Sequence, residues 1–320
     1  MLKYILLVAG FVCLIKGADF FVEASSSIAK LLKVPSLVIG LTVVAFGTSL
    51  PEAAVSISAA MKGQNALAMS NVTGSNIFNL LIVLGVSALF MGLTVDDDLL
   101  RKDFPASVLM TVLVLVLATG FSLKAFRGGG DYVLGRLQGG IILVCFIAYL
   151  VMIVLAALKA SNLMEGDEDY KVLSPVKTGV LLVVGIAGIA LGGNLVVDSA
   201  TDIALAFGLS QNFIGLTIVA MGTSLPELVT SIVASRKNEN DLAVGNVVGS
   251  NIFNLGFVIG SAAVISPVAV DGNACIDLVI LVGISVLCML LSITGKKIEK
   301  KEGIIMLITY AVFFAYIYTR

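Results

Sequence analysis

The hexapeptide GTSLPE occupies residues 47–52 and occurs again, unchanged, at residues 222–227. Each copy ends in a glutamate, Glu52 or Glu227, that lies within a long apolar stretch. An ionisable side chain inside a membrane is costly unless it faces a cavity or a partner, so it is interpreted as functional. Two such glutamates at matched positions predict one shared charged site.

The composition is that of a membrane protein. Of the 320 residues, 58% are hydrophobic and 13% are charged, which is too apolar for a soluble domain. A helix needs about 20 apolar residues to cross a bilayer. We therefore expect an all-α polytopic membrane protein with ten transmembrane helices. The predicted spans are residues 2–31, 36–60, 66–93, 103–123, 132–158, 176–207, 211–235, 242–268, 274–294 and 303–319.

The chain contains an internal repeat. Residues 38–80 align with residues 213–255 without a gap, and 28 of these 43 positions are identical. Because five spans is an odd number, the second copy enters the membrane from the opposite face, which is the inverted repeat of secondary transporters. We expect a first five-helix repeat over 1–158, an acidic cytoplasmic linker over 159–175 and a second, inverted repeat over 176–320.

The lysines and arginines predict the orientation of the chain. Thirteen of them fall on one side of the ten spans and six on the other, with Lys16 unassigned. The positive-inside rule places the richer side in the cytoplasm. We therefore expect a multi-pass protein of the cell membrane with both termini outside. The net charge of −1 gives no indication of nucleic-acid binding.

A proline predicts a helix break beside each glutamate. Pro51 has no N–H group and its ring clashes with the carbonyl of Gly47, so the helix should break or kink there, and Pro226 repeats the effect. Carbonyls freed inside a bilayer need protein, water or an ion as a partner. We expect freed carbonyls around residues 45–47 and 220–222, with a cation as their partner.

Side-chain oxygens complete the predicted site. Hydroxyls three or four residues before each glutamate share its side of a helical turn. The next span in each half has a polar residue at every fourth position, which forms a stripe that should face the glutamates. The hydroxyls belong to Thr48, Ser49, Thr223 and Ser224, and the stripes are Asn71, Ser75 and Asn79 with Asn246, Ser250 and Asn254.

These ligands indicate a site for hard cations. Oxygen donors suit calcium, magnesium or alkali ions rather than zinc or copper. Two carboxylates balance the charge of one divalent ion or of two monovalent ions. Since a buried, ionised pair of carboxylates without a cation would be costly, we expect one kind of ion to replace another. The four cysteines lie in apolar spans and are interpreted as packing residues. Since the chain has no histidine, any proton chemistry would use carboxylates.

A second acidic group lies toward the ends of the first and sixth spans. Asp19 and Glu23 are spaced four residues apart, as are Asp198 and Asp202. A role at the ion entrance and plain solvation at the membrane interface are both open for these four residues. We leave them out of the core site.

The two motifs resemble those of the calcium/cation antiporter superfamily, most closely its sodium/calcium exchanger branch of the compact prokaryotic type. The resemblance rests on the paired GTSLPE sequences and on GSNIFN at residues 74–79 and 249–254, and it covers essentially the whole chain. It implies that Glu52 and Glu227 are the principal calcium ligands and that helices 1 and 6 rock past the rest. It also implies assisting or sodium ligands: the carbonyls of Ala45 and Ala220, the hydroxyls of Thr48, Ser49, Ser75, Thr223, Ser224 and Ser250, and the amides of Asn79 and Asn254.

One position departs from part of that family. Some members, including the potassium-dependent branch, have an aspartate where this chain has Asn254. The missing carboxylate lowers the negative charge of the site and disfavours potassium co-transport. The ion stoichiometry of aspartate-bearing members therefore does not transfer directly.

Three functions remain open at this point. The leading one is a secondary antiporter that exchanges sodium for calcium by alternating access. A proton/calcium exchanger would use the same glutamates in a protonated form, and a calcium-permeable channel would use similar oxygen ligands. An enzyme is not expected, because no nucleophile with a base is recognisable. The expected partners are calcium and sodium ions and the lipid bilayer, with no cofactor, nucleic acid or obligate protein partner.

Overall fold

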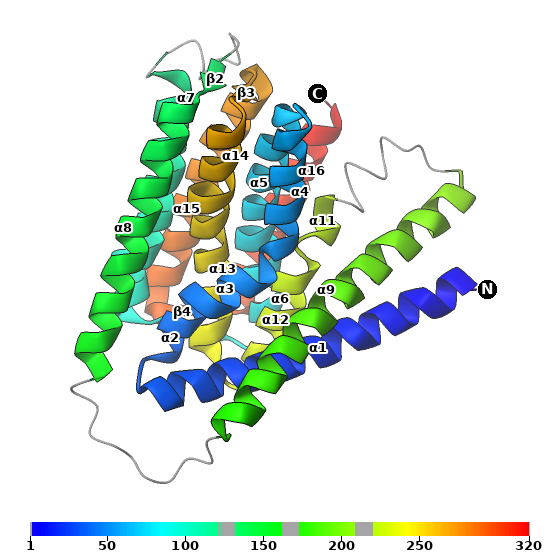
Figure 1. Cartoon of the computed structure of the whole chain (residues 1–320), viewed down its shortest axis with the longest axis vertical. Helices are drawn as coiled ribbons and strands as arrows, with labels where there is room; N and C mark the ends of the chain where they lie inside the picture. The colour runs from blue at the N-terminus through cyan, green and yellow to red at the C-terminus, as the bar shows by residue number, and fades with distance from the viewer. Residues whose placement is uncertain (1, 121, 123–131, 162–172, 209–219, 320) are drawn as a thin grey trace.

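The computed structural model describes residues 2–120, 122, 132–161, 173–208 and 220–319. These residues form a bundle of long helices with two short sheets (Figure 1). Most of the predicted linker over 159–175 and the first part of the predicted span over 211–235 lie outside the described residues.

The first half of the chain contains eight α-helices, three π-helices and two strands among the described residues. In chain order they are α1 (Leu2–Leu32), α2 (Ser36–Ile39), η1 (Gly40–Val44), α3 (Ala45–Thr48), α4 (Leu50–Met61), α5 (Asn65–Phe78), η2 (Asn79–Val83), α6 (Leu84–Phe90), β1 (Leu93–Thr94), η3 (Leu99–Asp103), α7 (Phe104–Thr119), β2 (Tyr132–Leu134) and α8 (Arg136–Ser161).

The second half repeats much of this order. Its elements are α9 (Pro175–Ala206), α11 (Ala220–Gly222), α12 (Leu225–Arg236), α13 (Asn240–Phe253), the π-helix η6 (Asn254–Ile259), α14 (Gly260–Ile265), β3 (Val268–Val270), α15 (Gly272–Ile293), the short 3₁₀-helix η7 (Thr294–Lys296), β4 (Lys297–Ile298) and α16 (Lys300–Thr319).

The described residues contain eight helices that are long and apolar enough to cross a membrane. A ninth span is formed if the bent pair Ser36–Thr48 and Leu50–Met61 counts as one. The prediction of a multi-pass helical protein is therefore confirmed. The count of ten is not reached, because the remaining predicted span, 211–235, begins among residues that the structure does not describe.

The centre of the bundle is formed by the two helices that carry the GSNIFN motifs. In the spans Leu67–Phe90 and Asn240–Ile265, 78% of the most apolar window is buried, whereas the value for the peripheral span Lys300–Thr319 is 17%. The broken helices that carry the GTSLPE motifs pack against these two central spans. The glutamates of both motifs are therefore buried inside the bundle.

Helices α1 and α9 form a closely packed pair that crosses the bundle obliquely (Figure 1). Small residues permit the close approach, as in many membrane helix pairs. A Cβ atom at Gly17 would lie 2.6 Å from the backbone nitrogen of Ile189, and one at Gly185 would lie 2.8 Å from that of Phe21. Ser27 and Thr178 add a hydrogen bond of 3.1 Å between the two helices.

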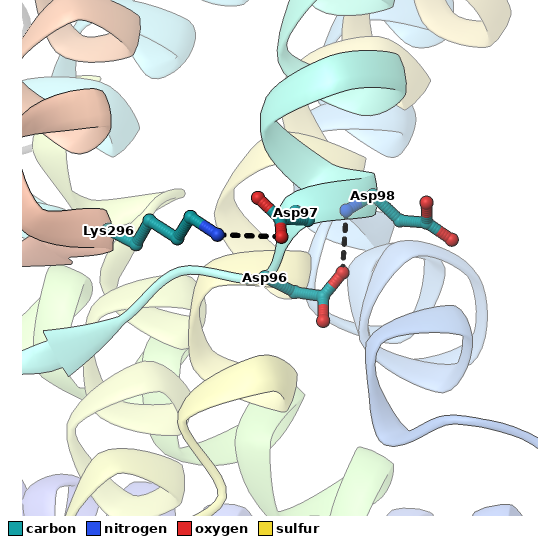
Figure 2. A network of polar contacts seen from close by, with 4 residues as sticks. All are labelled: Asp96, Asp97, Asp98 and Lys296. Atoms are coloured by element: carbon teal, nitrogen blue, oxygen red, sulfur yellow. Dashed lines mark hydrogen bonds and ion pairs between the residues drawn. The ribbon is translucent and has the colours of Figure 1, made fainter.

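The two short sheets lie toward opposite ends of the bundle (Figure 1). Strand β1 pairs with β4, and β2 pairs with β3, both antiparallel. Beside the first sheet, Lys296 donates a hydrogen bond of 2.7 Å to Asp97, and the backbone N–H of Asp98 donates to Asp96 (Figure 2). The hydrogen bond from Lys296 lowers the pKa of the Asp97 carboxyl.

Candidate ion-binding site

The GTSLPE helices break where the prolines predicted. Helix α3 ends at Thr48 and α4 begins at Leu50, with a bend of 51° between the two segments. The residue at the break is Ser49, and Ser224 has nearly the same backbone angles between α11 and α12. Pro51 and Pro226 occupy the first turn of the helix that follows, where a missing N–H group costs nothing.

The break places each glutamate at a helix N-terminus. Glu52 lies in the first turn of α4 and Glu227 in the first turn of α12. The free backbone N–H groups and the helix dipole favour a negative charge at that position. Both side chains are fully buried, with no exposed surface. The fold therefore supports two carboxylates at a depth where they would otherwise be costly.

The serines of the two hexapeptides bond across the repeat. Ser49 donates a hydrogen bond of 2.8 Å to Glu227, and Ser224 donates one of 3.0 Å to Glu52. The sequence placed each serine on the same side of a helical turn as the glutamate of its own hexapeptide, but it did not predict these bonds to the other half. The bend turns the serine away from its own helix and toward the other half.

The threonines of the motifs also face the site. Thr48 donates to the side-chain oxygen of Asn246 at 2.9 Å and lies 3.4 Å from the hydroxyl of Ser250. Ser250 in turn donates to the carbonyl of Ala45 at 3.4 Å. Thr223 contacts Glu52 from the opposite half. These residues lie together, as the sequence predicted.

The two predicted carbonyl ligands have different outcomes. The carbonyl of Ala45 accepts from the backbone N–H of Ser49 at 3.1 Å and points toward the hydroxyl of Ser250, so it borders the site. Ala220 is the first residue of α11 and follows residues outside the described part of the chain. A ligand role for its carbonyl stays a prediction.

The asparagine stripes face the site only in part. Asn246 donates to the backbone carbonyl of Glu227 at 3.4 Å and to Ser231 at 3.0 Å. Asn71, its counterpart, donates to the hydroxyl of Ser56 at 3.0 Å. Asn71 therefore ties α5 to α4, as Asn246 ties α13 to α12 through Ser231.

Four asparagines join the two central helices, and two of them, Asn76 and Asn251, were not included in the stripe pattern. Asn76 donates to the backbone carbonyl of Asn251 at 3.1 Å, and Asn251 donates to that of Asn76 at 3.2 Å. Asn79 and Asn254 donate to the side-chain oxygens of the same two residues, at 3.2 and 3.1 Å. All four are buried. The duplicated SN dipeptide within GSNIFN was the signal that could have revealed them.

A π-helix begins at each of the two outer asparagines of this cluster, at Asn79 and at Asn254. Single π-turns are rare and occur frequently at functional sites. The wider turn shifts the register of the helix, so the two segments of each span present different faces to the centre. No pattern of residues in either span predicted these turns.

Several buried oxygens at the centre have no hydrogen-bond partner within the described residues. They are one carboxylate oxygen each of Glu52 and Glu227, the side-chain oxygens of Asn79 and Asn254, and the hydroxyl of Ser75. The ion pairs among the described residues join Lys102 to Asp98, Lys237 to Asp19 and Lys296 to Asp97, and none involves these glutamates. Among the described residues, no group of three or more His, Cys, Asp or Glu is placed to hold a metal ion.

A cavity of about 400 Å³ leads to the site between α4 and α9. Its lining includes both motif prolines, Thr223, Asn194 and Asp198. Asp198 therefore lines this cavity, and a role for it at the ion entrance stays a prediction. Asp19, from the matched group on α1, forms an ion pair with Lys237.

A multi-pass helical bundle with two buried carboxylates among neutral oxygen donors defines a membrane cation-binding protein. Comparison with known proteins specifies the family. The family model described as sodium/calcium exchanger protein matches residues 2–155 and 177–319. The chain belongs to the sodium/calcium exchanger family.

Relatives and a solved structure agree with this assignment. The inner membrane protein YrbG of Escherichia coli (strain K12) is 38% identical over 85% of this chain and 82% of its own length. The sodium/calcium exchanger MaX1 of Methanosarcina acetivorans is 30% identical over 97% of both chains. The structure of the sodium-calcium exchanger NCX_Mj, soaked with 2.5 mM Na⁺ and 0.1 mM Ca²⁺, matches with a TM-score of 0.82 at 32% identity over 98% of both chains. The chain is thus a transporter and not an enzyme.

Proposed function

We propose that the protein is a secondary antiporter that exchanges sodium for calcium at one site between its two halves. The observation that carries the proposal is the pair of crossed serine–glutamate bonds, which join the hexapeptides of both halves around carboxylate oxygens that lack partners among the described residues. The named activity of MaX1 and of NCX_Mj supports sodium and calcium as the ions.

The chemistry of the donors fits these two ions. Calcium takes six to eight oxygen ligands in flexible geometry, whereas magnesium demands a tight octahedron. Glu52 and Glu227 supply the charge that balances one calcium ion or two sodium ions. The proposed neutral ligands are the carbonyls of Ala45 and Ala220 and the side chains of Thr48, Thr223, Ser49, Ser224, Ser75, Ser250, Asn79 and Asn254.

We propose that the two halves, 1–158 and 176–320, are inverted repeats within one transmembrane domain. Contacts that are exchanged between matched residues are the signature of a two-fold axis. The bonds between Asn76 and Asn251 have this form, and so do the crossed serine–glutamate bonds. The position of the two sheets toward opposite ends of the bundle (Figure 1) supports an axis that lies across the spans rather than along them.

Inverted repeats around one site provide alternating access, because exchanging the conformations of the two halves moves the opening to the other side. The cavity beside α9 is lined by Ala54 and Val55, which follow Glu52 on α4 toward the α4–α5 turn. With the orientation that the charge distribution predicts, this side is the cell exterior, both termini lie outside, and residues 159–175 are cytoplasmic.

Radiolabelled calcium flux in proteoliposomes tests the proposal. Vesicles loaded with sodium and diluted into sodium-free buffer should accumulate calcium, and vesicles with equal sodium on both sides should not. Potassium and pH gradients, imposed one at a time, should have no effect, and an observed effect of the pH gradient alone would identify a proton/calcium exchanger. Uptake that needs no counter-ion gradient, together with single-channel currents, would identify a channel instead.

A further inference from the structure

The α1–α9 pair contacts the rest of the bundle differently at its two ends. At one end α1 packs directly against α12. At the matched position of the other half, the cavity of about 400 Å³ separates α9 from α4. The structure is therefore closed on the α12 side and open on the α4 side, although both sides derive from the same repeated sequence.

Two polar contacts hold the closed side. Lys237 forms an ion pair with the Asp19 carboxylate and also donates to the Asp19 backbone carbonyl at 3.0 Å. Ser26, which is buried on α1, donates to the Glu239 carboxylate. Lys237 and Glu239 both lie in the α12–α13 turn, so one short turn binds α1 at two points. We refer to these four residues as the ionic latch.

The sequence offset of 175 residues identifies the counterpart of this latch. Lys62 and Gln64 in the α4–α5 turn match Lys237 and Glu239, and Asn194 and Thr201 on α9 match Asp19 and Ser26. We refer to these four residues as the neutral latch, because Asn194 and Gln64 have amides where Asp19 and Glu239 have carboxylates.

The turn of the neutral latch already has the shape that the ionic latch uses. The backbone N–H of Gln64 donates to the carbonyl of Ala59 at 2.9 Å, and that of Glu239 donates to the carbonyl of Ala234 at the same distance. The residue that precedes each of these two, Gly63 or Asn238, adopts left-handed backbone angles, with φ of 73° and 62° respectively. The turn therefore needs no refolding to accept α9.

The side chains of the neutral latch are available in the present conformation. Lys62, Gln64 and Asn194 are exposed, and Asn194 lines the open cavity. The hydroxyl of Thr201 is buried without a hydrogen-bond partner among the described residues. Closure of α9 onto α4 would give that hydroxyl a partner in Gln64, as α1 gives Ser26 a partner in Glu239.

We propose that the two latches close alternately and that their difference in charge sets the resting conformation of the transporter. The inference rests on the alternating access proposed above. Charge-assisted hydrogen bonds are roughly twice as strong as neutral ones. The side held by Asp19 and Glu239 is therefore closed at rest, and the side that carries Asn194 and Gln64 is open.

Hydrogen–deuterium exchange of the full-length protein in detergent tests the proposal without measuring transport. In the Asp19→Asn/Glu239→Gln variant, the two carboxylates of the ionic latch are replaced by amides, as at the matched positions of the neutral latch. Exchange in α12 should then become faster and exchange in α4 slower, each by about fivefold to tenfold, as expected for the loss of charged hydrogen bonds. Opposite changes in these matched helices report a shift of conformation.

The reciprocal variant, Asn194→Asp/Gln64→Glu, adds carboxylates to the neutral latch and should produce the same shift with the ionic latch intact. The control is Asp98→Asn, which removes an exposed carboxylate that pairs with Lys102 one turn away. It should change the exchange rate in neither α4 nor α12. Unchanged exchange in both variants, or faster exchange in α4 and α12 together, would overturn the latch proposal. The sodium-driven calcium flux of the wild type separately decides the proposed function.

Discussion

The centre of the molecule and its α1–α9 pair derive from the same duplication, but only the centre is symmetric. At the centre, the bond from Ser49 to Glu227 has its counterpart in the bond from Ser224 to Glu52. At the α1–α9 pair, the contact between Asp19 and Lys237 has no counterpart among the described residues, since Asn194 lines a cavity. On the proposals above, the difference separates two tasks: the symmetric centre holds ions, and the asymmetric pair defines which side is open.

The comparison predicts that the two glutamates are equivalent. Glu52→Gln and Glu227→Gln should each lower calcium uptake by at least about 100-fold, because each removes half of the negative charge of the site. Loss of a residue that only supports a metal ligand costs about 10- to 100-fold, and loss of a ligand itself should cost more. Calcium flux in proteoliposomes measures the effect. Glu299→Gln, in the exposed turn before α16, is the control and should retain wild-type flux. Loss of activity in only one of the two variants would contradict a shared site.

A second prediction concerns the asparagines that join the central helices. Asn76→Ala removes the side-chain donor to the Asn251 carbonyl and leaves the Asn254 amide without its acceptor, which should lower the free energy of unfolding by about 1–3 kcal/mol. Asn251→Ala should have an equal effect, and the double variant should lose less than the sum because the two residues share bonds. Thermal unfolding in detergent measures all three. Additive losses would show that the two residues act independently.

The α1–α9 pair provides a third prediction. In Gly17→Ala the new Cβ meets the Ile189 backbone at 2.6 Å, so the helices must separate at a cost of about 1–3 kcal/mol. Gly179→Ala on α9 is the matched control, because a Cβ atom at that position would meet no other atom within 4 Å. The control should leave stability unchanged or raise it slightly, as alanine favours helix. Equal thermal stabilities of the two variants would show that the pair is loosely packed.

The smallest effect is expected at the exposed Asp97–Lys296 pair (Figure 2). The lowered pKa of Asp97 means that the pair stabilises the protein above the ordinary aspartate pKa of about 3.9 and that this contribution disappears as the pH falls through the lowered value. Water and salt screen the pair. Asp97→Asn should therefore leave calcium flux unchanged between pH 6 and pH 8. A variant that loses flux in that range would indicate that this end of the bundle takes part in transport.

The sequence predicted the features that depend on local chemistry. Pro51 and Pro226 lack an N–H group wherever they occur, so the breaks beside Glu52 and Glu227 could be predicted and are confirmed. Apolar runs predicted the helical membrane architecture, because hydropathy is also a property of each local stretch of sequence. These features need no knowledge of how the two halves pack.

Features that depend on packing between the halves could not be predicted. Ser49 lies three residues before Glu52, which predicted that the two share one side of a helical turn, but the bend directs the Ser49 hydroxyl to Glu227. Asn76 follows Ser75 by one position and so falls outside the polar stripe, although it forms the link to the other half. The contact of α1 with α12 and the cavity between α9 and α4 also depend on how the helices of the two halves pack.

Equilibrium binding of radiolabelled calcium to the purified protein tests the central claim most directly. If Glu52 and Glu227 form one site shared by both ions, the wild type binds one calcium ion per chain, sodium displaces it completely, and Glu52→Gln and Glu227→Gln each abolish binding. Two calcium ions per chain, or calcium that sodium does not displace, would contradict the account.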